Sequence, residues 1–170
     1  ASNMWTWQFA KCVWLCRELN LHRLETMQTH YNLCYREEER EMIPFCKDQK
    51  ISLFSYNPVA KGFLTGKYTR DTENEGIRFK SDPGFKPKFF KPQDYDVLET
   101  VVKLASEKDV KPVQIALAWS LKKDITLPII GVTKKIHVEE AVESLNVKLT
   151  DDDIKQLEEP YKVQNINHLD

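Results

Sequence analysis

The chain contains little of what marks disulfide-rich or metal-binding proteins. It has four cysteines in 170 residues, and none of them form a C-x-x-C pair. Its four histidines are scattered, with no cysteine or carboxylate partner at a recognisable metal-ligand spacing. We therefore expect reduced core cysteines in a cytoplasmic protein rather than a disulfide framework or a zinc site.

Long apolar runs and an excess of one charge are also absent. No run of about 18 apolar residues occurs, so we expect no membrane span, and no signal peptide is recognisable. The formal net charge of -1 gives no general argument for affinity to nucleic acid or to membranes. The chain begins at Ala1 rather than at a methionine, which favours a piece of a longer protein.

Apolar periodicity predicts helices alternating with short strands. The first predicted helix is capped by Asn3, and its apolar residues lie nearly all round, so we expect heavy burial. A compact apolar run over 126–130 is typical of a buried parallel strand. Thr150 and Asp153 resemble a capping box. The predicted helices cover 4–19, 37–49, 94–108, a stretch from Pro112, 138–145 and a last helix after Thr150; the predicted strands cover 24–29, 51–55 and 126–130.

Strand–helix alternation indicates a parallel α/β architecture. Three strands cannot close a parallel barrel and would leave edges with unpaired backbone groups. A closed eight-stranded (β/α) barrel also needs about 250 residues. We therefore predict one partial domain over residues 1–170, with part of the fold missing.

The segment 55–68 is the strongest candidate for a ligand site. It follows the predicted strand 51–55 and contains an aromatic residue, a proline, two glycines and a lysine. Ligands bind at the carboxyl edge of parallel strands, so this segment predicts a ligand-binding loop. It is not a P-loop, because three residues instead of four separate Gly62 from Gly66 and no Ser or Thr follows Lys67.

Two further segments have a functional and a structural interpretation. The turn 131–134 lies between a strand and a helix, and it is either a phosphate site or a simple connection. Residues 78–92 mix basic and aromatic side chains, which suits nucleic acid, the phosphates of a dinucleotide or a solvated loop. With a nearly neutral chain and no nucleic-acid motif, we expect no nucleic-acid partner.

Five segments together resemble the C-terminal half of an aldo-keto reductase, nearest to the fungal aryl-alcohol dehydrogenase branch. The resemblance covers nearly the whole chain and implies about strands 6–8 of a (β/α)₈ TIM barrel, with their helices. It also implies NADPH as the cofactor. The segments that carry it are 1–4, 27–32, 56–68, 112–119 and 128–134.

The resemblance assigns cofactor-binding roles along the chain. Ser2, Asn3 and Gln28 match residues that hold the nicotinamide carboxamide, and Tyr56 matches the aromatic residue that stacks on the nicotinamide ring. Stacking and polar contacts of this kind would fix the face of the ring that is presented. The other matches are Asn57, Pro58, Val59 and Ala60 around the pyrophosphate, Lys67 and Arg78 reaching it, Gly131, Thr133 and Lys134 at the 2′-phosphate turn, and His137 and Glu140 beside the adenine.

No residue of this sequence matches the catalytic residues of the family. Those residues (an Asp, a Tyr, a Lys and a His) lie on the first four strands, whereas this sequence matches from the end of the fifth. The resemblance implies an NADPH-dependent oxidoreductase of aldehydes, ketones or aryl alcohols, represented by its cofactor-binding half. The alternative is a non-catalytic truncated product, or a cofactor-binding subunit that joins another chain through its exposed barrel edge.

Overall fold

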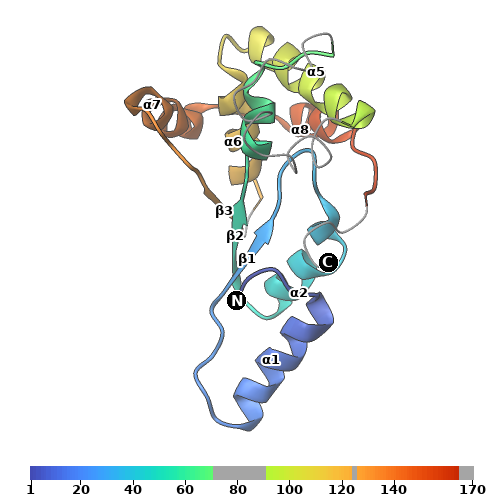
Figure 1. The fold of residues 1–170 in the computed structure, drawn as a ribbon, viewed down its shortest axis with the longest axis vertical. Coiled ribbons are helices and arrows are strands. Elements are labelled where there is room, and N and C mark those ends of the chain that lie inside the picture. Colours follow the sequence, from blue (N-terminus) through green and yellow to red (C-terminus); the bar gives the residue numbers. More distant parts are fainter. Residues whose placement is uncertain (71–90, 124–125, 165–170) are drawn as a thin grey trace.

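Three parallel strands form the centre of the fold (Figure 1). The computed structural model describes residues 1–70, 91–123 and 126–164. Strands β1 (Thr26–His30), β2 (Ser52–Tyr56) and β3 (Thr126–Ile129) lie side by side in the order β1-β2-β3. The first residues of the chain extend this sheet, because Ser2 bridges Gln28 in parallel. The predicted parallel α/β architecture is confirmed.

The helices lie around the three strands, most of them above or below the sheet in the view of Figure 1. In Figure 1, α5, α6 and α8 gather in the upper part, α1 extends from the lower end, and α7 lies apart at the left. Short 3-10 turns η1, η2 and η3 join them. The helices are α1 (Thr6–Glu18), α2 (Met42–Asp48), α5 (Pro92–Glu107), α6 (Pro112–Leu121), α7 (Lys135–Glu143) and α8 (Asp151–Glu158); the turns are η1 (Glu37–Glu39), η2 (Ala60–Thr65) and η3 (Ser144–Asn146).

The two faces of the sheet have different environments. Met27 and Leu53 are register partners on one face, where they pack with Phe9 of α1 and with α2. Because side chains alternate along a strand, Gln28 and its neighbours point to the opposite face. In a closed barrel that second face is the interior. Its register partners are Gln28 and Phe54, Phe54 and Leu127, His30 and Tyr56, and Tyr56 and Ile129.

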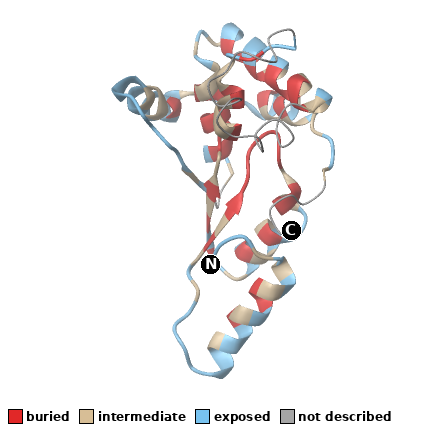
Figure 2. Ribbon diagram, viewed as in Figure 1, coloured by how far each residue is buried: buried red, intermediate tan, exposed pale blue. Residues whose placement is uncertain are grey.

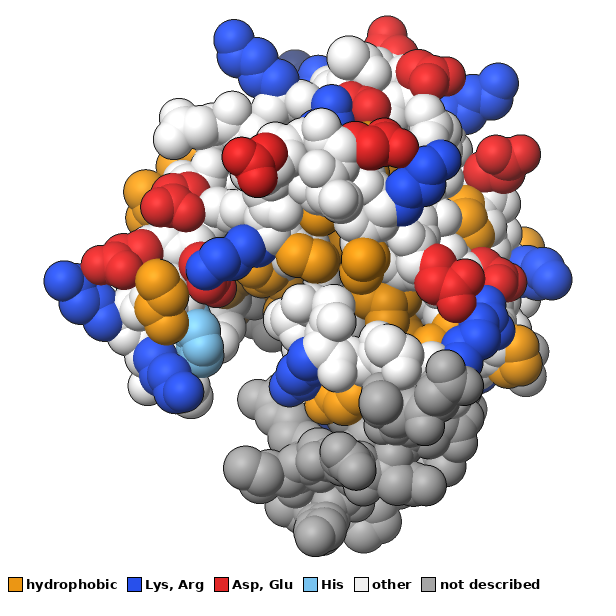
Figure 3. All heavy atoms as spheres, turned by 90° about the horizontal axis from the view of Figure 1, so that it is seen from above, with side chains coloured by type: hydrophobic (Ala, Val, Ile, Leu, Met, Phe, Trp, Pro, Cys, Tyr) orange, Lys and Arg blue, Asp and Glu red, His pale blue; other side chains and the backbone are white. Residues whose placement is uncertain are grey.

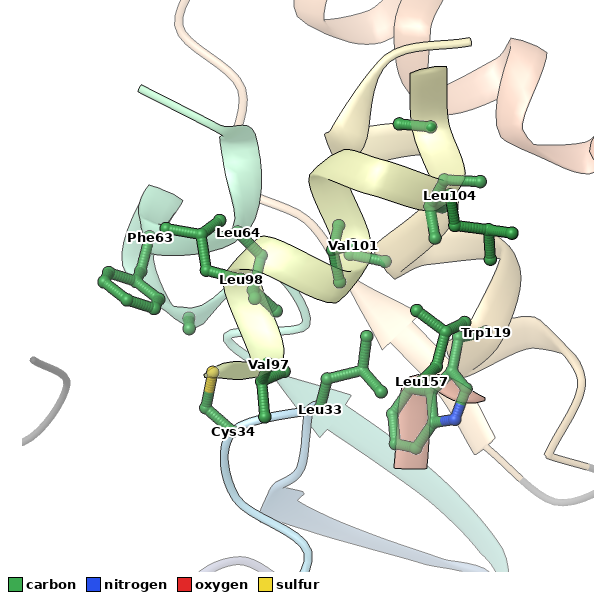
Figure 4. Close-up of a cluster of buried hydrophobic side chains, with 14 of the residues drawn as sticks. Leu33, Cys34, Phe63, Leu64, Val97, Leu98, Val101, Leu104, Trp119 and Leu157 are labelled. Carbon is green, nitrogen blue, oxygen red and sulfur yellow. The ribbon is translucent and has the colours of Figure 1, made fainter. Parts of the chain in front are cut away.

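The larger hydrophobic core lies among η2, α5, α6 and α8. Figure 4 shows Phe63 and Leu64 of η2 beside Leu98 of α5, with Trp119 of α6 close to Leu157 of α8. Each large side chain buried in this way contributes about 1.5–3 kcal/mol relative to exposure. This core anchors the loop that follows β2, and therefore the position of the candidate ligand segment.

The first helix differs from the prediction in its start and in its burial. Trp5, not Asn3, occupies the N-cap position, and its backbone N–H donates to Gln8 Oε1. Asn3 has a φ of 49° and uses its side chain elsewhere. Heavy burial all round is wrong for this structure, because Trp7 and Trp14 are 57% and 53% exposed. Only the stripe through Phe9, Ala10 and Val13 is covered by the sheet and α2.

The predicted helix over 37–49 is divided into η1 and α2. Pro44 explains the division, because proline has no backbone N–H and is tolerated only in the first turn of a helix. The helix therefore begins at Met42, which places Pro44 in that first turn. The acidic residues before it are used in tertiary contacts. Glu37, for example, accepts a hydrogen bond from the Tyr161 hydroxyl at 2.5 Å.

Strand β3, at the edge of the sheet, is parallel to β2 as predicted, but it is not buried. Leu127 and Ile129 are 50% and 41% exposed, since they point to the interior face and β3 has no further strand beside it among the described residues. Helix α7 follows it and contains no buried residue. Figure 2 shows this contrast, with buried residues along β1, β2 and α6 and exposed ones over α7.

Candidate functional site

Four residues expected at one end of the cofactor are connected across the sheet, from the middle of β1 to the carboxyl end of β2. The Tyr56 hydroxyl donates to Asn3 Oδ1 at 2.9 Å. The Asn3 backbone N–H donates to the Gln28 carbonyl at 3.1 Å, and Ser2 bridges Gln28. Ser2, Asn3, Gln28 and Tyr56 are thus joined by backbone and side-chain contacts. They form a polar edge with one half-buried aromatic ring beside it.

Tyr56 is the last ring of a stack of three. His30 lies parallel to Tyr56 with ring centroids 5.3 Å apart and an interplanar angle of 11°. His30 also stacks on Tyr35, with ring centroids 4.6 Å apart and an interplanar angle of 12°. His30 is 7% exposed, so the middle of the stack is closed to solvent. No role was predicted for His30 or Tyr35. Gln28 and His30 are two residues apart, so they lie on one face of β1, and that spacing was the available signal.

The loop after β2 turns sharply through several left-handed residues. Asn57, Ala60 and Lys61 have φ values of 54°, 48° and 54°, and Gly62 follows at 93°. The Ala60 N–H donates to the Asn57 carbonyl at 2.8 Å. Left-handed residues beside right-handed ones shape backbone concavities that suit anions. The side chain of Ala60 is fully buried and Pro58 is also buried, so this segment can offer a ligand its backbone.

Lys67 follows η2 in the chain, and its side chain turns back toward this loop. A Cβ at Gly62 would lie 3.5 Å from Lys67 Nζ, so the ammonium group lies over the turn. The same Nζ lies 4.9 Å from the centroid of the Tyr68 ring. Arg78, the other basic residue expected here, lies outside the described residues. The structure thus brings one expected cation to the loop.

The turn after β3 is open and leads into the N-terminus of α7. Gly131, Thr133 and Lys134 are all exposed, and Lys134 is the N-cap residue of the helix. A helix N-terminus carries partial positive charge, which favours anions. Tyr56 and Ile129 are register partners, so this turn leaves the same carboxyl edge as the loop after β2.

The two residues expected beside an adenine lie on the same face of α7. His137 and Glu140 are three residues apart on α7, hence on one helix face. Both are half-buried. Lys111 Nζ donates to Glu140 Oε1 at 2.5 Å, which ties this carboxylate to the start of α6.

One comparison decides the family. The model of the aldo/keto reductase family matches residues 2–162. The chain belongs to the aldo/keto reductase family. The resemblance drawn from the five sequence segments is therefore confirmed.

Individual relatives agree with this family. The chain is 38% identical over 165 residues to versiconal hemiacetal acetate reductase of Aspergillus parasiticus, covering 95% of this chain and 47% of that protein. It is 36% identical over 167 residues to AAD16 of Saccharomyces cerevisiae, which bears the name of an aryl-alcohol dehydrogenase, covering 96% of this chain and 47% of that protein. The chain thus spans about half the length of these relatives.

A solved structure supports the fold of this family member. The thermostable aldo-keto reductase Tm1743, crystallised with the inhibitor epalrestat, superposes with a TM-score of 0.67 at 18% identity. The match covers 94% of this chain and 46% of that one. The aldo/keto reductase chain is therefore part of a (β/α)₈ barrel, as its three parallel strands and flanking helices indicate.

Burial raises the pKa of the Tyr56 hydroxyl in the candidate site of this aldo/keto reductase chain. Desolvation raises the pKa of Tyr56, and the nearby carboxylate of Glu38 raises it further. Tyr56 is therefore a neutral hydrogen-bond donor at neutral pH. A neutral, half-buried ring is suited to stacking on another flat ring.

Other classes of site find little support in the described parts of this aldo/keto reductase chain. No group of three His, Cys, Asp or Glu residues there could hold a metal ion. None of the described helices is long and apolar enough to cross a membrane. On the face shown in Figure 3, the described Lys and Arg residues are interspersed with Asp and Glu, so the described residues form no continuous basic patch there.

Proposed function

We propose that this chain is the cofactor-binding part of an NADPH-dependent aldo-keto reductase. The observation that carries the proposal is the contact of Tyr56 with Asn3, at the edge where Ser2 bridges Gln28. It joins one flat ring at the carboxyl end of β2 to Asn3, whose backbone N–H donates to the Gln28 carbonyl. That arrangement suits a nicotinamide ring and its carboxamide.

The rest of the cofactor would lie along two neighbouring strand ends. The pyrophosphate fits the backbone turn 57–62 with Lys67 above it, because that segment offers left-handed backbone and one cation. The 2′-phosphate fits Thr133 and Lys134 at the N-terminus of α7. The adenine then lies toward His137. Arg78, outside the described residues, is proposed as a second cation for the pyrophosphate.

The substrate is proposed to be a small aldehyde, ketone or aryl alcohol. The family and the names of the relatives support this class. In the complete reaction the bound nicotinamide would transfer a hydride to or from the substrate carbon. The residues of this chain would orient the ring; none of them is assigned a proton-transfer role. A cytoplasmic location is proposed on the four free cysteines.

A second candidate is a cofactor-binding subunit that joins another chain through its barrel edge. Exposed apolar residues on β3 and α7 favour it, since contiguous exposed apolar surface marks interaction sites. The amphipathic face of α7 is uncovered, with Val138 and Val142 45% and 58% exposed. Light scattering would separate the two candidates: a monomer supports the first, and a stable assembly supports the second.

Activity and cofactor preference test the proposal. The chain alone should consume no NADPH with an aromatic aldehyde above the protein-free rate, and turnover would contradict the assignment. In nuclear magnetic resonance titrations, NADPH should bind more tightly than NADH. Lys134→Ala should remove that difference, whereas the adjacent exposed variant Lys135→Ala should keep it. Equal affinities in the unmodified chain would overturn the 2′-phosphate assignment.

A further inference from the structure

We propose that His30 is a positioning residue that fixes the ring of Tyr56 for stacking on the nicotinamide. The inference rests on the proposed cofactor site. It adds to that site the buried His30, which lies behind the Tyr56 ring. His30 itself would not touch the cofactor. It would act by holding the one aromatic surface that does.

The geometry of the stack carries this inference. Tyr35, His30 and Tyr56 lie with successive centroids 4.6 and 5.3 Å apart and interplanar angles of 12° and 11°. A ring that is stacked on one face can present only its other face to a ligand. The nicotinamide would therefore be the fourth ring in the series. Tyr56 is held at its rim as well, since its hydroxyl donates to Asn3 Oδ1.

A buried amide fixes the imidazole in turn. Asn32 is fully buried, and its Oδ1 accepts the backbone N–H of Cys34 at 2.9 Å. That contact identifies Nδ2 as the donor. Nδ2 lies 2.9 Å from the Asn57 carbonyl and 3.1 Å from His30 Nε2. The His30 Nε2 therefore accepts, and the proton of the neutral imidazole is on Nδ1.

The same amide connects the stack to the phosphate loop. Asn57 follows Tyr56 directly and has a left-handed φ of 54°. By holding the Asn57 carbonyl and His30 Nε2 together, Asn32 sets the direction of the chain leaving β2 relative to the ring stack. A change at His30 should therefore disturb the nicotinamide end of the site more than the adenine end, which lies on α7.

The first arm of the test uses the protein without ligand. The chain is labelled in its tyrosine rings, and the Tyr56 signals of His30→Ala, His30→Gln and His30→Phe are compared. Phe keeps a stacking ring without the nitrogen, and Gln keeps a polar group without the ring. We expect broadened or averaged Tyr56 signals in the Ala and Gln variants and preserved signals in Phe. The exposed histidine variant His22→Ala is the control. Unchanged Tyr56 signals in His30→Ala would overturn the inference.

The second arm compares NADPH with 2′,5′-ADP, which has the adenine end but no nicotinamide. His30→Ala should weaken NADPH binding by roughly 2- to 12-fold, the range expected for one aromatic contact, and leave 2′,5′-ADP binding unchanged. His30→Phe should restore most of the loss. Equal weakening of both ligands would indicate a merely structural role and overturn the inference. If the unmodified chain binds neither ligand, the proposed function fails, while the first arm still decides whether His30 fixes the ring.

Discussion

The Tyr56 hydroxyl donates to Asn3 Oδ1 at 2.9 Å, a contact between residues 53 positions apart in the chain. It joins the end of β2 to the segment that runs beside β1. The backbone bond from the Asn3 N–H to the Gln28 carbonyl lies next to it. This contact therefore links three of the residues proposed to hold the nicotinamide.

The first prediction concerns this contact. Tyr56→Phe removes only the hydroxyl, and a hydrogen bond at an exposed position contributes about 0.5–1 kcal/mol. We expect the segment 1–3 to loosen, so the Asn3 amide should exchange with solvent about 2- to 5-fold faster. The Leu53 amide inside the sheet should not change. Equal exchange at Asn3 in both proteins would show that the contact does not hold the segment.

The second prediction concerns the buried amide of Asn32. Asn32→Ala leaves the Cys34 N–H and the Asn57 carbonyl without this partner in a buried region. Each such group costs about 1–3 kcal/mol, so the two together predict a loss of about 2–6 kcal/mol in the free energy of unfolding by urea. The exposed variant Asn146→Ala should change it by less than about 0.5 kcal/mol. Similar values for both variants would contradict the structural role of Asn32.

The third prediction is a pH dependence from Asp94. Burial raises the pKa of Asp94 to about 6, against the opposing effects of the Lys91 backbone N–H and charge and of Gln164. The folded chain thus keeps a proton that the unfolded chain releases near pH 4. The free energy of unfolding should fall as pH rises from about 4 to 6, by an amount on the order of 2–3 kcal/mol.

Asp94→Asn isolates this effect, because the amide cannot ionise. Urea unfolding at several pH values should show the variant gaining stability relative to the unmodified chain as pH rises through this window. Other carboxylates titrate in both proteins and cancel in the difference. A constant difference between the two proteins from pH 4 to 7 would refute the shifted pKa.

The fourth prediction concerns the start of α8. Thr150 Oγ1 accepts the Asp153 N–H at 3.1 Å, and Asp153 Oδ2 accepts the Thr150 N–H at 2.7 Å. Thr150→Ala should cost about 1 kcal/mol in thermal or urea unfolding, whereas Thr150→Ser keeps the oxygen and should cost little. If Ser is as damaging as Ala, the methyl group rather than the cap stabilises this turn.

Local patterns predicted much of the fold. The capping box at Thr150, the helix that starts near Pro112 and the helix over 94–108 depend on near neighbours, and all three elements are present. The exposure of Ile129 was not predicted, because it depends on what lies across the barrel interior. A run of apolar residues predicts that a strand is buried in the complete fold. It does not show whether the elements that would cover the strand are present.

The candidate site also contains some residues that were expected from the sequence and others that depend on distant contacts. Ser2, Asn3, Gln28 and Tyr56 were expected together through the family resemblance, and the structure brings them to one edge. His30 and Asn32 were missed, since their partners Tyr56 and Asn57 are some 25 residues away. Such contacts follow from strand register, which a local sequence pattern does not contain.

The most direct test of the central claim is a titration of the labelled chain with NADPH, followed through its backbone amides. We expect NADPH to bind more weakly than micromolar, because this chain forms only part of a barrel. Shifts should be concentrated at Asn3, Gln28, Tyr56 and the turn 131–134. No shifts up to millimolar NADPH, or shifts confined to other surfaces, would contradict a cofactor site at this edge.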